Sequence, residues 1–434
     1  MTRTASVVVV GGGLAGLVTA RTLARDGFDV TLYERRGAVG GRVRTTERDG
    51  YRLDRGFQVL FTAYPAVRAE LDLPALDLRE FAPGAVIARD GRRSTLSDPF
   101  RDPEGVPETL CNSDVTLTDK LGILRLRHQF AGRDPDQIFE GPDATIDQYL
   151  RDQGFSDRFI DNFAAPFYGG ITLDRSLSTS KRIFEYTFRA LAAGSIAVPA
   201  KGMGRIPEQL AASAESEGVA IETDTTVTAV DATDGGATCT LEPAGRRREE
   251  TVDVDAVVVA TDPPTARELT GVESIPTTSK GCVTQYYTLP GWTDLETGKR
   301  LLLNADDGSG PNQIVPHSAV APAYAPNGST LLGATYLGQL EDDVDDEALA
   351  GRTRRALESW YPDRRFDDLE TVHTERIPFA QFAQPPGIHD ELPGPRAPNG
   401  RCYLAGEYTR WSSIQGALES GRRAALAVRV DLEG

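Results

Sequence analysis

Three glycines near the start of the chain have the spacing of a phosphate-binding turn. Gly11, Gly13 and Gly16 form the pattern G-x-G-x-x-G. The first glycine permits a tight turn, the second lets the backbone approach a pyrophosphate, and the third lets a helix pack closely on a strand. Glu34 follows about 20 residues later, where an acid can accept hydrogen bonds from ribose hydroxyls. These residue types therefore predict a bound dinucleotide.

The elements around these glycines support that prediction. The sequence predicts a buried parallel strand over 7–10, a helix over 14–26 and a second strand over 29–33, directly before Glu34. Because the helix begins at the turn, its free N–H groups and the positive end of its dipole would face the phosphates. Glycine-rich turns also occur where nothing binds, but this one follows a strand, precedes a helix and has its acid at the expected distance.

A second glycine pair resembles the pyrophosphate-binding segment of one flavoprotein superfamily. Glu34 is followed by RRGAVGGRVRT, in which Gly40, Gly41 and Arg42 are consecutive. This stretch is similar to the E-x(5)-GGR motif of the amine oxidases, protoporphyrinogen oxidases and phytoene desaturases, whose glycines and arginine backbone lie over the FAD pyrophosphate. The Arg42 side chain would contact a phosphate or the flavin, or it would form a salt bridge between domains. The next stretch, GYRLDRGFQVL, with Asp54, resembles the superfamily's D-x-G motif close to the flavin.

The resemblance returns in the middle of the chain and near the C-terminus. IETDTTVTAV resembles the strand that contacts the adenine, and DAVVVATDPP, over 255–264, resembles the strand and turn that follow. RCYLAGEYTRWSSIQGALESGRRAALAV, over 401–428, is similar to the closing motif, in which a strand and a loop precede the last helix. A helix N-terminus beside the flavin ring can stabilise negative charge on a reduced flavin.

These matches run from Val7 to Val428, so the resemblance covers the whole chain. It implies an α/β fold with a discontinuous Rossmann-type FAD-binding domain and an inserted mixed α+β substrate-binding domain, as in the amine oxidases. Glu34 would hold the adenosine ribose, and Val227 would contact the adenine. The full set of implied FAD contacts is Gly11, Gly13, Leu14, Ala15, Gly16, Glu34, Arg35, Gly41, Arg42, Gly56, Phe57, Gln58, Val227, Gly406, Glu407, Ile414 and Gln415.

The order of the motifs predicts two intertwined domains. The FAD-binding domain is expected to comprise 1–75, 196–270 and 396–434, and the substrate-binding domain 76–195 and 271–395. The first insertion shows helical spacing of Leu, Ile, Tyr and Phe, whereas the second holds strand-like runs separated by Gly, Pro and Asp. We therefore expect a mixed or antiparallel sheet in the substrate-binding domain.

Candidates for a catalytic residue are few. Lys280 lies roughly where amine oxidases carry a lysine that holds a water near the flavin, although a surface lysine is the simpler interpretation. Tyr408 and Trp411 lie in the C-terminal loop, where amine oxidases enclose the amine between aromatic rings. Tyr286 and Tyr287 are adjacent on a predicted strand, so one should point to each face. Further candidates for the pocket wall are Phe167, Tyr168, Phe379 and Phe382.

The resemblance implies an FAD-dependent oxidoreductase that takes a hydride from a small hydrophobic substrate. Carotenoid or isoprenoid desaturation is slightly preferred, because the segment PFYGGI resembles the desaturases and the catalytic lysine is weakly supported. A related segment, PAKGMGRIPEQLA, has Lys201 where those enzymes usually have glycine. The alternatives are an amine oxidase that produces hydrogen peroxide and a flavin-dependent isomerase without net redox change.

Composition limits the partners. The 434 residues carry a formal net charge of −17, which speaks against nucleic acid and against electrostatic attachment to anionic lipid. An acidic, lysine-poor chain is typical of salt-adapted organisms, and we expect a halophilic source. The acidic run DDVDDE, from Asp342, is expected to be a solvated loop or helix start, and no metal site is predicted.

The four scattered cysteines favour a reducing compartment and show no metal-binding spacing. The chain enters a core strand at once, which indicates no signal peptide, and no apolar run is long enough to span a membrane. We therefore expect a cytoplasmic protein, and peripheral membrane contact through an apolar face stays open.

Overall fold

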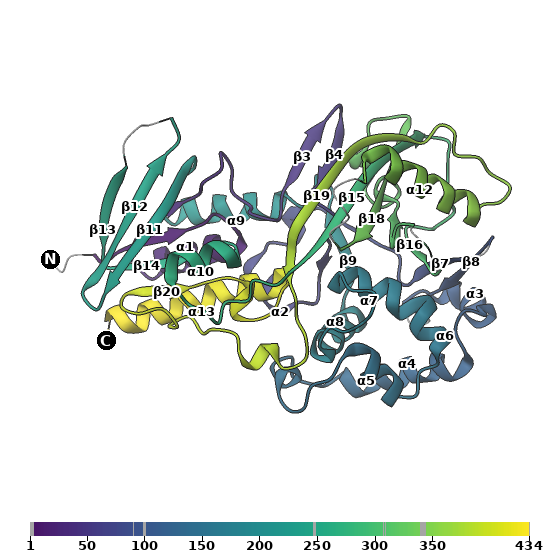
Figure 1. The fold of residues 1–434 in the computed structure, drawn as a ribbon, viewed down its shortest axis with the longest axis horizontal. Helices are drawn as coiled ribbons and strands as arrows, with labels where there is room; N and C mark the ends of the chain where they lie inside the picture. Colours follow the sequence, from purple (N-terminus) through teal and green to yellow (C-terminus); the bar gives the residue numbers. More distant parts are fainter. Residues whose placement is uncertain are drawn as a thin grey trace.

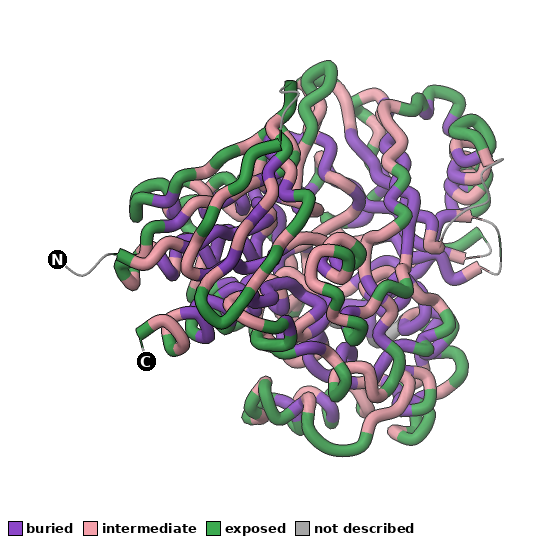
Figure 2. Tube along the Cα trace, turned by 60° about the vertical axis from the view of Figure 1, so that its left-hand side comes forward, coloured by how far each residue is buried: buried purple, intermediate pink, exposed green. Residues whose placement is uncertain are grey.

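Two lobes lie side by side in the computed structural model of the chain, as Figure 1 shows. One lobe is built on a parallel sheet and holds both termini, and the other is built on a larger mixed sheet flanked by helices. In both lobes the strands and the helices packed on them form the buried core (Figure 2). The structure describes residues 4–89, 91–98, 101–245, 249–306, 308, 310–338 and 344–433.

The parallel sheet has five described strands in the order β10-β2-β1-β14-β20. Their bounds are Ala220–Glu222 (β10), Asp29–Tyr33 (β2), Ser6–Val10 (β1), Ala256–Val259 (β14) and Cys402–Leu404 (β20). Helix α1 (Leu14–Arg25) connects β1 to β2, so the predicted strand–turn–helix–strand unit is confirmed. Because β1 lies centrally, the turn after it opens at the carboxyl edge of the sheet, where ligands bind in such folds.

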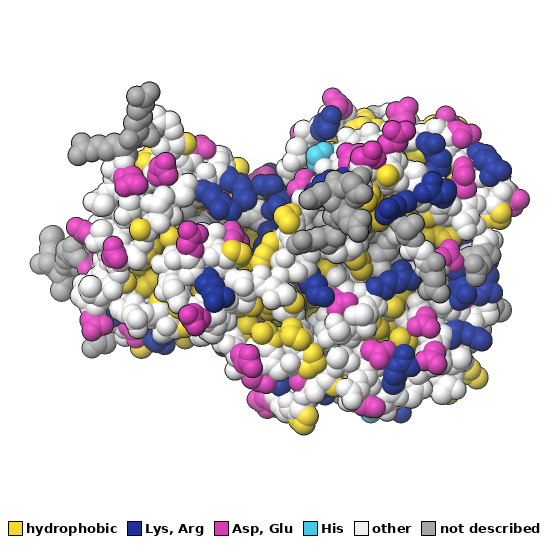
Figure 3. All heavy atoms as spheres, viewed as in Figure 1, with side chains coloured by type: hydrophobic (Ala, Val, Ile, Leu, Met, Phe, Trp, Pro, Cys, Tyr) yellow, Lys and Arg dark blue, Asp and Glu magenta, His cyan; other side chains and the backbone are white. Residues whose placement is uncertain are grey.

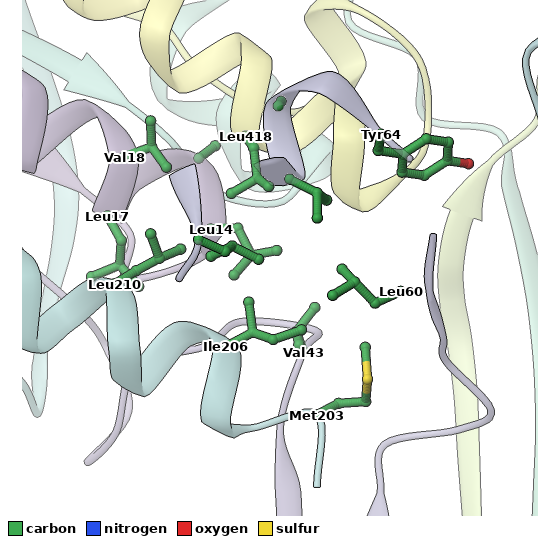
Figure 4. Packing of buried hydrophobic residues seen from close by; sticks show 14 of the residues in the cluster. Leu14, Leu17, Val18, Val43, Leu60, Tyr64, Met203, Ile206, Leu210 and Leu418 are labelled. Carbon is green, nitrogen blue, oxygen red and sulfur yellow. The ribbon is translucent and has the colours of Figure 1, made fainter. Parts of the chain in front are cut away.

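The two faces of this sheet are covered differently. Val7 and Val9 point to the face covered by α1, α9 (Arg205–Ser216) and α13 (Ile414–Glu433), and Figure 4 shows part of that packing. Val8 and Val10 point to the other face, where they pack against a three-stranded antiparallel sheet. That sheet comprises β11 (Thr225–Thr233), β12 (Gly236–Pro243) and β13 (Glu250–Val254).

The second lobe contains a mixed sheet of seven described strands in the order β19-β15-β18-β17-β16-β7-β8. Only β16 and β7 are paired in parallel among them, so the predicted mixed sheet is confirmed. Their bounds are Glu370–Phe382 (β19), Ser279–Pro290 (β15), Ser329–Leu337 (β18), Gln313–Val315 (β17), Leu301–Asn304 (β16), Ala85–Arg89 (β7) and Arg92–Leu96 (β8).

Helices cover both faces of the mixed sheet. Ile87 and Ala85 face a group of helices from the first insertion, whereas Val86 and Ala88 face α12 (Asp346–Trp360). The helices of that group are α3 (Val106–Cys111), α4 (Leu117–Phe130), α5 (Ile146–Asp152), α6 (Asp157–Phe159), α7 (Ala165–Thr172) and α8 (Lys181–Ala193). A π-helical turn over 160–164 joins α6 to α7.

Short elements connect the two lobes. The hairpin of β3 (Thr45–Arg48) and β4 (Tyr51–Asp54) stands between them in Figure 1. The remaining strands and helices are β5 (Leu60–Phe61), β6 (Leu78–Glu80), β9 (Ile196–Pro199), α2 (Pro65–Glu70), α10 (Pro263–Thr270) and α11 (His317–Val320). The parallel sheet thus takes strands from three separated stretches of chain, while the predicted domain boundaries stay a prediction.

The described cysteines and the described part of the acidic run have structural rather than metal-binding positions. Cys239, Cys282 and Cys402 are buried free thiols, and burial raises the pKa of each to about 12. Asp345 caps α12 by accepting the Ala348 N–H at 2.7 Å, whereas the first two aspartates of the acidic run lie outside the described residues. Within the described ranges, no cluster of His, Cys, Asp and Glu could hold a metal ion, and no helix could cross a membrane.

Candidate functional site

The first glycine turn is tightly packed except at Gly13. Gly11 has φ +110°, and its N–H donates to the Tyr33 carbonyl at 2.8 Å. A Cβ on Gly11 would lie 2.8 Å from the Ala260 carbonyl oxygen, and one on Gly16 would overlap the Gly11 carbonyl oxygen. A Cβ on Gly13 would meet no atom within 4 Å among the described residues. Gly13 therefore opens onto a space at the start of α1 that a phosphate could approach.

Glu34 is fixed at the end of β2 by the same turn. The side chain is buried, and its Oε2 accepts the Gly12 N–H at 2.7 Å. Its Oε1 accepts the Arg36 N–H at 3.0 Å. Since a carboxylate oxygen has more than one lone pair, both oxygens can still accept a ribose hydroxyl. The arrangement is compatible with the predicted ribose contact.

The second glycine pair lies directly against the first turn. Gly40 has φ +123°, and its N–H donates to the Gly12 carbonyl at 2.7 Å. Gly41 has φ +60°, and a Cβ placed on it would lie 3.3 Å from the Gly13 Cα. Both backbone conformations favour glycine. The two glycine loops therefore form one wall of backbone, and their contact with a pyrophosphate stays a prediction.

A cavity of about 550 Å³ extends from these loops into the second lobe. Most of the predicted FAD contacts lie in its wall, and Gly16 and Gln415 are the exceptions. Those that line the cavity are Gly11, Gly13, Leu14, Ala15, Glu34, Arg35, Gly41, Arg42, Gly56, Phe57, Gln58, Val227, Gly406, Glu407 and Ile414. Their individual roles toward a cofactor stay predictions.

The Gln415 side chain turns away from the cavity. It is buried, and its Oε1 accepts the Ala66 N–H at 2.8 Å, where α2 begins. An orphan N–H at a helix start needs such an acceptor. The Oε1 of this side chain therefore fixes α2 to the start of α13, and the predicted flavin contact of Gln415 stays a prediction.

Several buried polar atoms in the cavity wall have no hydrogen-bond partner among the described residues. They are the Oε1 atoms of Gln58 and Glu407 and the Nε1 of Trp411. The other end of the Gln58 amide is fixed, since its Nε2 donates to the Arg42 carbonyl at 2.9 Å. Buried polar groups are normally hydrogen-bonded, so these acceptors and this donor fit a polar ligand. A flavin with its ribityl chain offers hydroxyl, N–H and carbonyl groups, and it matches this set.

The Arg42 side chain joins the N-terminal and C-terminal motifs. Its guanidinium forms an ion pair with Glu407, and its Nη1 donates to the Ala380 carbonyl at 3.1 Å. This salt bridge joins two segments of the predicted FAD-binding domain, and the predicted contact of Arg42 with a phosphate or the flavin stays a prediction. The pair fixes the loop after β20 beside the second glycine pair.

The far end of the cavity is apolar. Its wall comes from α7, α8, β9, β16 and β19, together with the segment that follows β4. The hydrophobic residues there are Phe61, Tyr64, Pro166, Phe167, Ile171, Leu173, Ile183, Ile196, Leu301, Leu303 and Ile377, and the polar ones are Thr187, Gln313 and Gln381. Of the four aromatic pocket candidates, Phe167 and Phe379 line the cavity, whereas Tyr168 and Phe382 pack in hydrophobic clusters.

The other candidate catalytic side chains mostly lie outside the cavity. Lys280 forms an ion pair with Asp174 at 3.2 Å and does not line the cavity wall. Tyr408 is fully buried, and its hydroxyl donates to the Ala405 carbonyl at 3.1 Å, so it belongs to the core. Trp411 does line the cavity. Of these two candidates, only Trp411 could therefore contact a ligand in this cavity.

Tyr286 and Tyr287 point to opposite faces of the sheet, as their adjacency predicts. Tyr287 packs in the cluster under α12, and its hydroxyl lies 2.9 Å from the Thr353 hydroxyl. Tyr286 packs in the cluster of the first lobe, and its hydroxyl donates to the Asp54 carbonyl at 2.7 Å. Neither ring lines the cavity.

The Asp54 carboxylate is directed into a buried hydrogen-bond network rather than toward the cavity. It accepts from the Thr45 hydroxyl at 2.5 Å, from the Met203 N–H at 2.9 Å and from the Tyr324 hydroxyl at 2.8 Å. Burial raises the pKa of Asp54 to about 6, although these three bonds favour the charged form. The network holds the end of β4, and thus the Gly56 loop that lines the cavity.

Comparisons with known proteins agree with this architecture. A proposed protoporphyrinogen oxidase from Exiguobacterium sp. superposes with a TM-score of 0.72 at 18% identity and covers 100% of both chains. A putrescine oxidase with bound putrescine gives 0.69 at 18% identity over 99% of each chain. An oxidoreductase from Methanosarcina mazei gives 0.67 at 16% identity, over 98% of this chain and 100% of that one. At these identities the likeness is one of fold.

Curated relatives match over short segments. A 4,4'-diapolycopen-4-al dehydrogenase from Metabacillus indicus is 44% identical over 50 residues, which are 12% of this chain and 10% of the relative. A 4,4'-diaponeurosporene oxygenase from Staphylococcus haemolyticus is 40% identical over 58 residues, 13% of this chain and 12% of the relative. The match thus spans about a tenth of each relative's length.

The family model of the flavin-containing amine oxidoreductases matches residues 14–429, which is most of the chain. It covers the glycine loops from Leu14 onward, both insertions and the closing helix, and the cavity wall suits a flavin. The chain belongs to the flavin-containing amine oxidoreductase family.

Proposed function

We propose that this protein is an FAD-dependent oxidoreductase that takes a hydride from an apolar substrate of isoprenoid type. The observation that carries the proposal is the hydrophobic wall at the apolar end of the cavity, where the described residues include no carboxylate and where Arg55 stands only at the border. A substrate that fills this end exchanges water for hydrophobic surface, which is favourable only for an apolar body.

The carboxylates of the cavity wall all lie in segments of the dinucleotide end, away from the apolar end. Among the described residues they are Glu34, Asp262 and Glu407, and each belongs to a segment that resembles a dinucleotide motif. A protonated amine buried at the apolar end would have no counter-charge there, and burying an unpaired cation is costly. Lys280 is engaged by Asp174 outside the cavity. Both observations favour the apolar substrate over the amine.

FAD, rather than another flavin, is supported by the length of the binding wall. The cavity is lined by Val227 and Glu34 at one end and by Gln58 and Trp411 nearer the apolar end. A dinucleotide would place adenosine at the first pair and the flavin ring at the second. When bound, the flavin would accept the hydride. The protein's own residues would orient the ring through Gln58, Glu407 and Trp411, and the apolar wall would keep water away from the reacting carbon.

Anaerobic titration of the FAD-loaded protein tests the proposal. Purified protein is mixed with one member of a panel of carotenoids or amines, and the oxidised-flavin absorbance is followed. Bleaching by a carotenoid, together with a product lighter by two hydrogens, is the expected result. Bleaching by amines alone would refute the apolar substrate. A carotenoid that changes geometry without changing mass would favour the isomerase alternative.

The partners and the location follow the proposed substrate. The acidic charge favours a protein without nucleic-acid partners, and a cytoplasmic, halophilic protein stays the expectation. Peripheral contact with a membrane is compatible with α4, which exposes Leu117, Leu121 and Leu124 along one side. We also retain the discontinuous domain division, with the cavity between the FAD-binding and the substrate-binding segments.

A further inference from the structure

Arginines gather where the dinucleotide end of the cavity meets the apolar end. Arg36 and Arg55 line the cavity, and the Arg44 carbonyl accepts the Arg55 N–H at 2.9 Å. Figure 3 shows Lys and Arg side chains concentrated in the hollow between the two lobes. The chain as a whole has a net charge of −17, so this local excess of positive charge runs against the overall composition.

Arg55 is held by the Glu375 carboxylate through its Nε alone, so its two terminal nitrogens can still donate hydrogen bonds. Its Nε donates to Glu375 Oε1 at 3.1 Å, and the other oxygen of Glu375 lies 3.2 Å from His373 Nε2. The structure records no partner for the two terminal nitrogens of Arg55 within the described part of the chain. A guanidinium with both terminal N–H₂ groups free can bind a carboxylate or a phosphate in bidentate fashion.

Arg44 and Arg36 add unbalanced charge beside this group. Neither side chain has an ion pair or a hydrogen bond among the described residues. Burial, and after it the positive charges of Arg55 and Arg36, lower the pKa of Arg44, and the smaller opposing effects of Glu375 and Glu34 do not cancel this. Like charges that are partly withdrawn from water repel one another, and a bound anion would relieve that repulsion.

The position of Arg55 separates it from the expected phosphate site. The phosphates are expected at Gly13, where the backbone opens into the cavity. Arg55 instead precedes Gly56, where a Cβ would lie 2.7 Å from the Ile377 side chain. Ile377 packs with Leu173 and Cys282, and all three line the cavity. Arg55 therefore stands beside the apolar wall.

We propose that Arg55 forms an anion subsite that binds the head group of the substrate, a carboxylate or a phosphate on an apolar body. Arg44 does not line the cavity and would add positive charge beside Arg55. The inference rests on the proposed apolar substrate and adds to it that the substrate is amphiphilic. Arg36, which lies next to the Glu34 segment, would serve the dinucleotide side of the same cavity.

Binding of matched amphiphiles to the FAD-loaded protein tests the subsite. Dodecanoate, dodecyl phosphate and dodecan-1-ol share one apolar tail, and each is titrated at constant ionic strength while the flavin absorbance is followed. We expect one of the two anions to bind at least about tenfold more tightly than the alcohol. The stronger anion identifies the head group. The Arg55→Gln variant should lose that preference and keep the affinity for dodecan-1-ol, whereas Arg44→Gln should only reduce the preference.

Control variants separate the subsite from other effects. Arg52→Gln removes an arginine of β4 that pairs with Glu47 outside the cavity, so it should keep the wild-type preference. Arg55→Lys retains the charge without the planar fork, and it should bind the anion with intermediate affinity if Arg55→Gln does not fold.

Two results would overturn the subsite, and they differ from failure of the proposed function. If the alcohol binds as tightly as both anions, the apolar pocket stands and the anion subsite is wrong. If the Arg55→Gln variant is purified without FAD and does not take it up when FAD is added, Arg55 serves the dinucleotide phosphates instead. Failure of all three amphiphiles to bind would refute the apolar substrate itself, and the subsite with it.

Discussion

Replacing two glycines of the same turn by alanine should have different effects, one on FAD affinity and the other on the stability of the apoprotein. At Gly13 a Cβ meets no atom within 4 Å among the described residues, whereas at Gly16 it would overlap a backbone oxygen. We therefore expect Gly13→Ala to weaken FAD binding with little effect on the apoprotein. Gly16→Ala should destabilise the apoprotein, because α1 must move away from the turn after β1 to make room.

The magnitudes follow from separate contributions. At Gly13 the N-cap preference lost on changing Gly to Ala is about 1 kcal/mol at most, and the reduced entropy of the unfolded chain returns about 0.4–1 kcal/mol. The free energy of unfolding should thus change by less than about 1 kcal/mol. At Gly16, overpacking against backbone should cost about 1–3 kcal/mol or more. Losing one charge-assisted hydrogen bond to a phosphate costs about 1.5–3 kcal/mol, so FAD should bind Gly13→Ala at least about tenfold more weakly.

Urea unfolding of the flavin-free proteins, together with FAD titration monitored by flavin fluorescence, measures the two effects independently. Unchanged FAD affinity in Gly13→Ala would show that the backbone there does not approach the pyrophosphate. A Gly16→Ala apoprotein as stable as the wild type would show that α1 can shift at no cost. Either result would refute the reasoning drawn from the packing of this turn.

Three further substitutions test other parts of the site. Trp411→Phe removes an unpartnered N–H and should weaken FAD binding by about 0.5–1.5 kcal/mol, measured by the same titration. Lys280→Met should leave turnover nearly unchanged and cost at most about 1 kcal/mol in unfolding experiments, because it breaks a partly exposed pair with Asp174; a large loss of turnover would restore the amine-oxidase prediction. Asp54 binds a proton more tightly when folded, since burial raises its pKa from 3.8 to about 6. The protonated carboxyl therefore stabilises the folded protein below pH 3.8, the pKa in the unfolded chain, and this stabilisation is lost as the pH rises through about 6, the pKa in the folded protein. Between these two pH values the free energy of unfolding of the wild type should fall by about 3 kcal/mol relative to that of Asp54→Asn. Parallel pH profiles of the two unfolding free energies would contradict this.

The dinucleotide end was predictable because its signals are local. A turn that needs positive φ or a close backbone approach demands glycine, and Gly11, Gly40 and Gly41 all meet such a demand. The hydrophobic pattern of neighbouring residues likewise predicts the strand–turn–helix unit around them, and β1, α1 and β2 form where that pattern indicates.

Local sequence signals did not determine where the side chains of the site point or which partners they bind. Gln415 lies in a segment that resembles a flavin-binding motif, yet its amide serves the backbone of Ala66, more than three hundred positions away. Lys280 likewise finds its partner in Asp174, on the connection that follows α7. Such partners depend on how distant segments pack, and the spacing of residues in one segment carries no information about them.

The residues that form the apolar end of the cavity could not be predicted from local sequence signals either. Its wall is assembled from Phe61, Phe167, Ile196, Leu303 and Ile377, which come from separate elements and share no motif. Apart from Phe167, which the sequence marked as a pocket candidate, each has the sequence pattern of an ordinary core residue. The cofactor end is constrained by backbone geometry that few substitutions satisfy, whereas the apolar end requires only volume and hydrophobicity, which many side chains supply. Substrate choice can therefore change through the insertions while the cofactor site stays intact. Replacing Leu303 with Phe should accordingly alter the preferred length of an apolar substrate without lowering the FAD content of the purified protein.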